Sequence, residues 1–264
     1  MASPATGMSL TEESRKATRR VHKISDAVVL SKLLVVLAGG PGLYGRAIAC
    51  FWPVYASLEA KLAAHATHPA LAPVAAAYDR LARAPAIASD LAALLGADWR
   101  AAAAAEAAAN PAVGAYLAHL EALEAEDPAL LLGYCYGLHF VSLFGPLGKR
   151  IRGALGLAAD APGVAMYALP DSGGALRALR AAVDAGGEAL SAGQRARVIE
   201  ETVSMYRLNN RVVSGFAPGL KAYLLAPFAA AAALPPWAAA GAVATVGAIA
   251  AIVWMRAAAA SPSG

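Results

Sequence analysis

Apolar residues recur at helical spacing along most of this chain, and long alternating patterns typical of half-buried strands are absent. Ser9-Leu10-Thr11-Glu12 has the form of a capping box, which marks the start of a helix. Proline and glycine divide the rest of the pattern into segments. The sequence therefore predicts an all-α protein. The predicted helices span residues 10–29, 43–65, 74–83, 85–95, 99–109, 111–125, 128–155, 175–185 and 191–211, with Glu200 and Glu201 on the outer face of the last.

The pattern changes near the C-terminus, where the chain becomes almost free of charge. Residues 222–255 contain no ionisable side chain other than one tyrosine, and Pro235-Pro236 divides them. Residues 237–255 form an apolar run that would make a helix of about 28 Å, close to the roughly 30 Å thickness of a bilayer core. Trp237 and Trp254 lie at its two ends, where interfacial aromatic residues are common. We therefore expect a C-terminal membrane anchor.

These patterns divide the chain into five parts. We expect a disordered N-terminus over 1–8, one helical domain over 9–221, a Pro/Ala-rich linker over 222–236, a transmembrane helix over 237–256 and a short polar tail over 257–264. The first residues lack a basic stretch followed by an apolar core, so we expect no cleaved secretory signal. The helical domain would then face the cytosol, tethered to membrane lipid by its tail.

Composition and charge narrow the possible functions. Apolar residues make up 59% of the chain and charged residues 15%, and much of the apolar excess is alanine, a strong helix former. The net charge of +4 is small for a nucleic-acid binder, so we expect no nucleic-acid partner. The two cysteines form no CxxC motif, which argues against a zinc site and against a disulfide framework.

Positive charge is concentrated in one short segment that ends near a histidine. The segment is either a solvated helix face or an anion-binding rim. Arg15 and Arg19 precede His22 by seven and three residues, and Asp26 follows it by four, so these side chains share one side of a helix. Neutral imidazole is a common metal ligand in proteins, and its second ring nitrogen usually needs an acceptor. The alternative is a salt-bridged helix surface. The five basic residues are Arg15, Lys16, Arg19, Arg20 and Lys23.

A series of short motifs, in order along residues 10–213, resembles the heme oxygenase family. The matching segments are Ala17-Thr18-Arg19-Arg20-Val21-His22, residues 52–59 (WPVYASLE), residues 68–73 (HPALAP), Asp90-Leu91 with Gly96 and Trp99, residues 130–134, and residues 197–201 (RVIEE) with Tyr206 and Asn209. The resemblance implies a heme-oxygenase-like helical bundle. A C-terminal anchor also occurs in animal members of the family, which points to the endoplasmic reticulum membrane.

The resemblance also implies roles for individual residues. His22 matches the proximal ligand of the heme iron, and Asp26 matches the family's proximal carboxylate. Arg15 and Arg19 stand where the family has lysines that bind the heme propionates, and an arginine fork can engage a carboxylate at two atoms. Further propionate partners are Arg177, Arg180 and Tyr134. The implied activity is oxygen-dependent opening of heme b to biliverdin, carbon monoxide and iron, with electrons from an NADPH-dependent reductase.

The predicted distal helix departs from the family pattern. The family carries a G-D-L-S-G-G run, in which glycines allow close approach to heme and the Asp orders water for proton delivery. Here residues 139–144 read HFVSLF, so Ser142 alone is retained and the Asp position holds Phe140, or Val141 in a register shifted by one. His139 would ligate iron opposite His22, act as a distal hydrogen-bond donor, or be buried as a structural residue.

These substitutions lead to a prediction about activity. We expect ring opening to be poor or absent, with His139 and Ser142 as the remaining candidates for distal catalytic residues. The alternative functions are a non-catalytic heme carrier or sensor with two histidine ligands and a heme-free, membrane-anchored scaffold.

Overall fold

The computed structural model describes residues 7–142, 145–169 and 171–233, without the side chains of residues 79, 140–142, 145 and 227–233. All secondary structure in these ranges is helical, as predicted. The helices are α1 (Leu10–Ala38), α2 (Gly40–Ala49), α3 (Trp52–Ala64), α4 (Ala72–Leu81), α5 (Ala84–Leu95), α6 (Trp99–Ala109), α7 (Pro111–Glu126), η1 (Pro128–Leu131), α8 (Leu132–Ser142), α9 (Gly145–Ala154), η2 (Ala165–Tyr167), α10 (Ser172–Glu188), α11 (Ala192–Gly215) and α12 (Leu220–Ala233).

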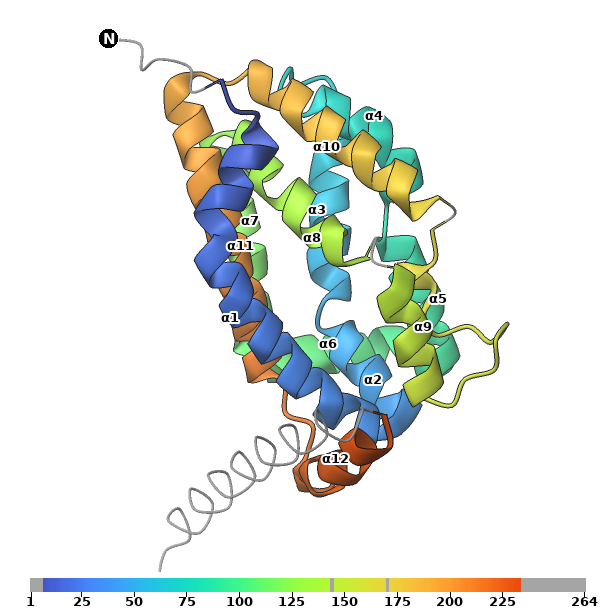
Figure 1. Ribbon diagram of the computed structural model, residues 1–264. Helices are drawn as coiled ribbons and strands as arrows, with labels where there is room; N and C mark the ends of the chain where they lie inside the picture. Colours follow the sequence, from blue (N-terminus) through green and yellow to red (C-terminus); the bar gives the residue numbers. More distant parts are fainter. Residues whose placement is uncertain (1–6, 143–144, 170, 234–264) are drawn as a thin grey trace, which may run out of the picture.

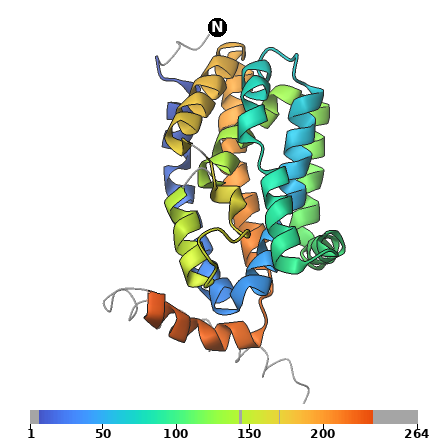
Figure 2. The same ribbon diagram turned by 90° about the vertical axis from the view of Figure 1, so that its right-hand side faces the viewer.

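The helices form one bundle, in which the long α1 and α11 lie side by side (Figures 1 and 2). Helix α8 packs against α10 and α11, and α1 also packs against both, so α1 and α8 flank a common region. Helix α12 lies across the end of the bundle where α1 passes into α2, and the connection from α10 to α11 lies at the opposite end. This arrangement places the predicted proximal and distal helices near each other.

The N-terminal end of α1 is fixed by polar contacts. The predicted capping box is present, with the Ser9 side chain accepting from the Glu12 backbone and the Glu12 carboxylate accepting from the Ser9 N–H. Asp184 on α10 accepts from the Thr11 N–H at 2.8 Å and from the Thr11 hydroxyl at 3.0 Å. Arg195 on α11 pairs with Glu13 at 2.8 Å. These contacts hold α1 against both neighbouring helices.

Three of the predicted helices differ from the structure in their bounds. Helix α1 continues to Ala38 because residues 30–38 are apolar and bury Val35 and Val36, and it ends before Gly40, whose φ of +80° favours glycine. The predicted helix over 43–65 is two helices, since Pro53 lies in the first turn of α3, where the backbone donor that it lacks is not needed. The predicted long helix over 128–155 is likewise divided into η1, α8 and α9.

Residues 222–236, predicted as a linker, are largely covered by α12. Alanine and leucine favour the helix, and burial of Ala222 and Ala226 fixes it to the bundle. Within the described ranges, no helix combines the length and apolar character that a bilayer span requires. The predicted anchor over 237–256, the polar tail over 257–264 and most of the predicted disordered N-terminus lie outside the described residues.

Two carboxylates from the sequence motifs, the buried Asp90 and the partly buried Glu59, have structural contacts. Asp90 accepts from the backbone N–H groups of Gly163, Ala165 and Met166, which fixes the loop around η2, and burial raises the pKa of this carboxyl. Glu59 accepts from the N–H groups of Arg83 and Ala84 at the start of α5. Both motifs therefore set the positions of elements around the bundle core.

Candidate functional site

A cleft of about 590 Å³ lies between α1, α8, α10 and α11. Its size falls within the range of small-molecule sites in proteins. The sequence predicted several of the residues that line it, and their spacing along α1 places them on one side of that helix. These lining residues are Arg15, Arg19 and His22 on α1 and Arg180 on α10.

His22 is positioned in this cleft by two neighbours. Its Nδ1 lies 3.0 Å from the Asp26 carboxylate, one turn further along α1, as the sequence predicted. Its ring packs at a tilt against Tyr206 of α11, with 5.4 Å between the ring centroids. The His22 side chain remains 42% exposed. Because Nδ1 is held by the carboxylate, Nε2 is the ring nitrogen available to a ligand in the cleft.

The rim of the cleft is strongly basic. Arg15, Lys16, Arg19 and Lys23 line it, and none of them forms an ion pair within the described part of the chain. The nearby acid Glu12 is engaged in the helix cap. Cations without an ion-pair partner favour an anionic ligand.

Helices α8 and α10 contribute a second polar group to the rim. Arg180 donates from Nε to the Tyr136 hydroxyl across 3.1 Å, and both residues line the cleft. Sequence reasoning missed Tyr136. Arg177, by contrast, is exposed on α10 and does not line the cleft.

Tyr134, which the sequence assigned to a propionate, does not line the cleft in this structure. Its ring is fully buried, and its hydroxyl donates to the Glu201 carboxylate at 3.0 Å. Burial raises the pKa of this hydroxyl far above its ordinary value, which keeps it protonated as a donor. Two residues along a helix rotate a side chain by about 200°, so Tyr134 and Tyr136 point to different sides of α8.

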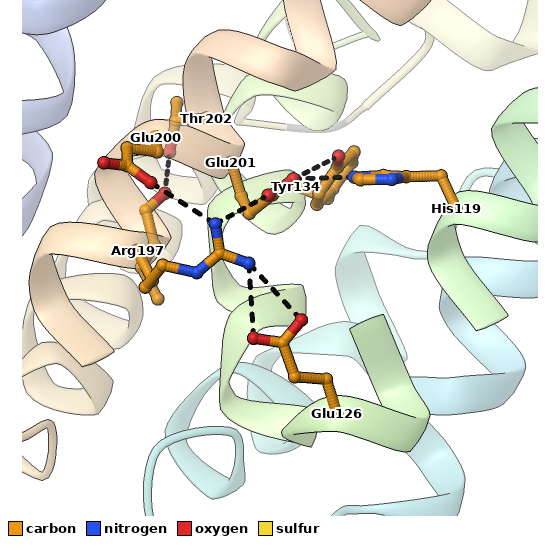
Figure 3. A network of polar contacts seen from close by, with 8 residues as sticks. His119, Glu126, Tyr134, Arg197, Glu200, Glu201 and Thr202 are labelled. Carbon is orange, nitrogen blue, oxygen red and sulfur yellow. Dashed lines mark hydrogen bonds and ion pairs between the residues drawn. The ribbon is translucent and has the colours of Figure 1, made fainter. Parts of the chain in front are cut away.

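Glu201 belongs to a polar network behind the cleft (Figure 3). The sequence prediction that it lies on an outer face is wrong, because only 4% of the residue is exposed. The Oε2 atom of Glu201 lies 2.7 Å from His119 Nε2. Arg197 lies 3.8 Å from Oε1 of Glu201 and forms an ion pair with Glu126 at 3.2 Å. The network joins α7, α8 and α11 through a buried carboxylate that is stabilised by donors.

His139 is fully buried in the core and does not line the cleft. Its Nδ1 lies 3.0 Å from the Cys135 carbonyl, and the Tyr78 hydroxyl lies 2.9 Å from Nδ1 and 2.8 Å from Nε2. The imidazole packs edge-on against Tyr55 and Tyr78, and Nε2 lies 3.8 Å from the Glu59 carboxylate.

In this structure His139 therefore does not line the cleft that contains His22, where either predicted distal role would place it. The contacts of His139 favour the third alternative, a buried structural residue, because both ring nitrogens find polar neighbours within the core. The side chain of Ser142, the other predicted distal residue, lies outside the described part of the structure.

A second, smaller hollow of about 170 Å³ follows the C-terminal half of α1. It is mainly apolar and is lined by residues of α1, α2, α3, α8 and α11, among them Val36, Tyr55 and Leu138. Asn209 lines it as well, and its buried Oδ1 has no hydrogen-bond partner among the described residues. An unpaired buried oxygen favours a water molecule or a ligand donor at this place.

Several proteins of known identity are similar to this chain in sequence and in fold. Heme oxygenase 1 of Nostoc sp. (strain PCC 7120) is 25% identical over 163 residues, which cover 61% of this chain and 66% of that protein. The crystal structure of heme oxygenase 2 from Chlamydomonas reinhardtii without heme superposes with a TM-score of 0.72 at 26% identity, covering 80% of this chain and 99% of that one.

A second solved structure shares the fold at lower identity. It is heme oxygenase-1 from the cyanobacterium Synechocystis sp. PCC6803 in complex with heme, with a TM-score of 0.67, 21% identity and coverage of 78% and 91% of the two chains. The resemblance inferred from the motifs is thus confirmed. A sequence profile of the heme oxygenase family matches residues 8–215, which is most of the chain, and the protein therefore belongs to that family.

Proposed function

We propose that this protein binds heme in the cleft between α1 and α8, with His22 Nε2 as the protein ligand of the iron. The observation that carries the proposal is the position of His22, which lines the cleft while Asp26 holds its Nδ1. A carboxylate at this distance fixes the ring orientation and makes the other nitrogen a better ligand.

The basic rim fits the propionates of heme. Arg15 and Arg19 supply guanidinium groups on α1 that form no ion pair with the described residues, and the Arg180–Tyr136 pair supplies donors from the other side. Arginine suits this role because its planar fork matches the geometry of a carboxylate. Asp26 lies beyond His22 along α1, which leaves the rim itself positive.

The family's activity is the proposed reaction: opening of heme to biliverdin, carbon monoxide and iron, with oxygen and reductase-supplied electrons. Bound heme would supply the iron that activates oxygen. His139 is engaged by Tyr78 and the Cys135 carbonyl, which removes it as a competing ligand and favours an enzyme over a carrier with two histidines.

The sequence lacks the carboxylate that delivers protons during ring opening in the family. Phe140 or Val141 stands where the family has an Asp, and neither side chain transfers a proton or orders water. We therefore propose that ring opening is slow. The same substitution supports a second candidate function, a non-catalytic heme carrier with His22 as its single protein ligand.

We also propose that residues 237–256 anchor the protein in a membrane, with the bundle facing the cytosol. The support is the uncharged run of 19 residues between Trp237 and Trp254. Because a C-terminal anchor also occurs in animal members of the family, we propose the endoplasmic reticulum membrane. Cell fractionation followed by alkaline carbonate extraction tests this placement, and recovery of the full chain in the soluble fraction would contradict it.

Heme titration of the wild type and of His22→Ala tests the ligand. We expect loss of stoichiometric binding in the variant and recovery of the Soret band when imidazole is added. His68→Ala is a matched control, since His68 lies in a turn outside the cleft. An unchanged affinity and spectrum in His22→Ala would exclude His22 as the ligand.

Single-turnover heme loss separates the slow enzyme from the carrier. The assay supplies a generic NADPH-dependent reductase, with catalase present to remove peroxide. Slow formation of biliverdin supports the enzyme, and intact heme after prolonged reduction in oxygen supports the carrier. Fast formation would show that another group delivers the proton and that the distal substitutions matter little.

A further inference from the structure

Helix α12 carries an apolar face that no part of the described chain covers. Leu220 is 57% exposed, Leu224 is 58% exposed and Leu225 is 40% exposed. Ala222 and Ala226, on the side of the helix opposite Leu220 and Leu224, are buried against the bundle. The small residues thus face inward and the large apolar residues face outward, the reverse of the usual order for a surface helix.

The helix is nevertheless held firmly on the bundle. Lys32 of α1 donates from Nζ to the Phe216 carbonyl at 2.9 Å and to the Tyr223 hydroxyl at 3.3 Å. α12 also packs along α1, across the base of the bundle (Figures 1 and 2). The exposed leucines are therefore presented on a fixed element.

The position of α12 in the chain identifies what covers these leucines. The helix ends at Ala233, and the uncharged run that we propose as a membrane anchor begins at Trp237. Four residues span at most about 14 Å even when fully extended. If the anchor crosses a bilayer, the end of α12 lies within that distance of the membrane surface.

We propose that α12 is an interfacial helix, lying in the headgroup region of the bilayer with Leu220, Leu224 and Leu225 directed toward the acyl chains. This inference rests on the proposed anchor. Lys221, which is exposed beside these leucines, keeps its ammonium group among the lipid headgroups while its stem covers apolar surface. An amphipathic helix of this kind binds a bilayer through its buried apolar area.

The interfacial helix would set the orientation of the heme cleft. Lys32 joins α1 to α12, and His22 lies ten residues earlier, about 15 Å along the axis of α1. With α12 on the lipid, the cleft with its basic rim stands above the membrane surface. The cytosol then has access to the cleft, although the protein is anchored nearby.

The test uses the full chain in lipid vesicles, with an environment-sensitive nitrobenzoxadiazole label on Leu224→Cys. The native thiols do not compete for the label, because Cys50 and Cys135 are buried. Ala189→Cys is the matched control, since this exposed residue follows α10 at the end of the bundle opposite α12. Vesicles contain lipids with a spin label near the headgroup, which quench fluorescence by contact.

We expect the Leu224→Cys label to shift its emission to shorter wavelength and to lose most of its intensity, while the Ala189→Cys label changes little. Flotation with vesicles but water-like, unquenched emission at position 224 would overturn the interfacial helix and leave the anchor standing. Quenching that depends on the protein-to-lipid ratio and not on spin-labelled lipid would overturn it in favour of contact between two copies.

Failure of the chain to float with vesicles would overturn both the interfacial helix and the anchor. Heme titration of the same labelled proteins reports the heme-binding proposal separately. It also verifies that each variant is folded, since both substitutions are at exposed positions.

Discussion

Arg180 Nε lies 3.1 Å from the Tyr136 hydroxyl, and this hydrogen bond connects α10 to α8 at the rim of the proposed heme cleft. Two residues earlier, Tyr134 directs its hydroxyl to Glu201 on another side of α8. Two tyrosines on one helix thus have separate roles, which makes each a control for the other.

Tyr136→Phe should weaken heme binding several-fold. The substitution removes a hydroxyl that positions Arg180 and that can donate to a propionate, and a single hydrogen bond contributes about 1 kcal/mol, or roughly a fivefold change in Kd. Titration with ferric heme measures the change. Tyr134→Phe should leave the Kd as it is, because Tyr134 is buried outside the cleft, and equal losses in the two variants would contradict these assignments.

Tyr134→Phe should instead lower the free energy of unfolding, by about 1.5–3 kcal/mol, because it removes a hydrogen bond to a buried carboxylate. Urea denaturation measures the change. His119→Ala removes a second partner of the same Glu201 oxygen, so the two substitutions together should not be additive. Additive effects would show that the two donors act independently of the shared carboxylate.

Cys50 should make the stability depend on pH in the alkaline range. Burial raises the pKa of this thiol from an ordinary 9.0 to about 11. Between these values the unfolded chain loses the proton and the folded chain keeps it, so the stability falls as the pH rises from 9 to 11, by up to about 2–3 kcal/mol. In Cys50→Ala the decline over this range should be shallower by that amount.

The slope, rather than the stability at one pH, is the quantity to compare in this experiment. Cys50→Ala also removes the packing contacts of a buried sulfur. This loss of packing lowers the free energy of unfolding by the same amount at every pH, so it does not alter the slope. Ser89→Ala, an exposed change without a titrating group, should keep the wild-type slope. Identical slopes in Cys50→Ala and Ser89→Ala would show that the thiol titrates alike in both states.

The proximal part of the site could be read from the sequence because its residues lie close together on one helix with a polar side. Helical spacing is sufficient to place Arg15, Arg19, His22 and Asp26 together, and the structure brings the first three into one cleft. No long-range pairing is needed for this part of the prediction.

The distal side could not be read in the same way. Helix α8 is buried on several sides, with Tyr134, Cys135, Leu138 and His139 all inaccessible, so it has no polar stripe that shows which residues face a ligand. The burial of Glu201 could not be predicted from the sequence either, because its partners Tyr134 and His119 lie 67 and 82 positions earlier in the chain. Such contacts depend on tertiary packing, which local periodicity does not report.

His139→Ala should destabilise the fold and leave the heme spectrum unchanged. The imidazole is fully buried among Tyr55, Tyr78 and the Cys135 carbonyl, so its loss creates a cavity and leaves the Tyr78 hydroxyl without this partner. We expect a cost of about 2–4 kcal/mol in the free energy of unfolding, measured by urea denaturation.

The spectrum of the ferric heme complex gives the second readout for His139. If His22 is the single protein ligand, added azide should shift the Soret band of wild type and His139→Ala in the same way, because His139 does not line the cleft and contacts Tyr78 in the core. A band that azide fails to shift in the wild type but shifts in His139→Ala would show that His139 reaches the iron after all. That result would require α8 to rotate, with the contacts between His139 and Tyr78 broken in the heme complex.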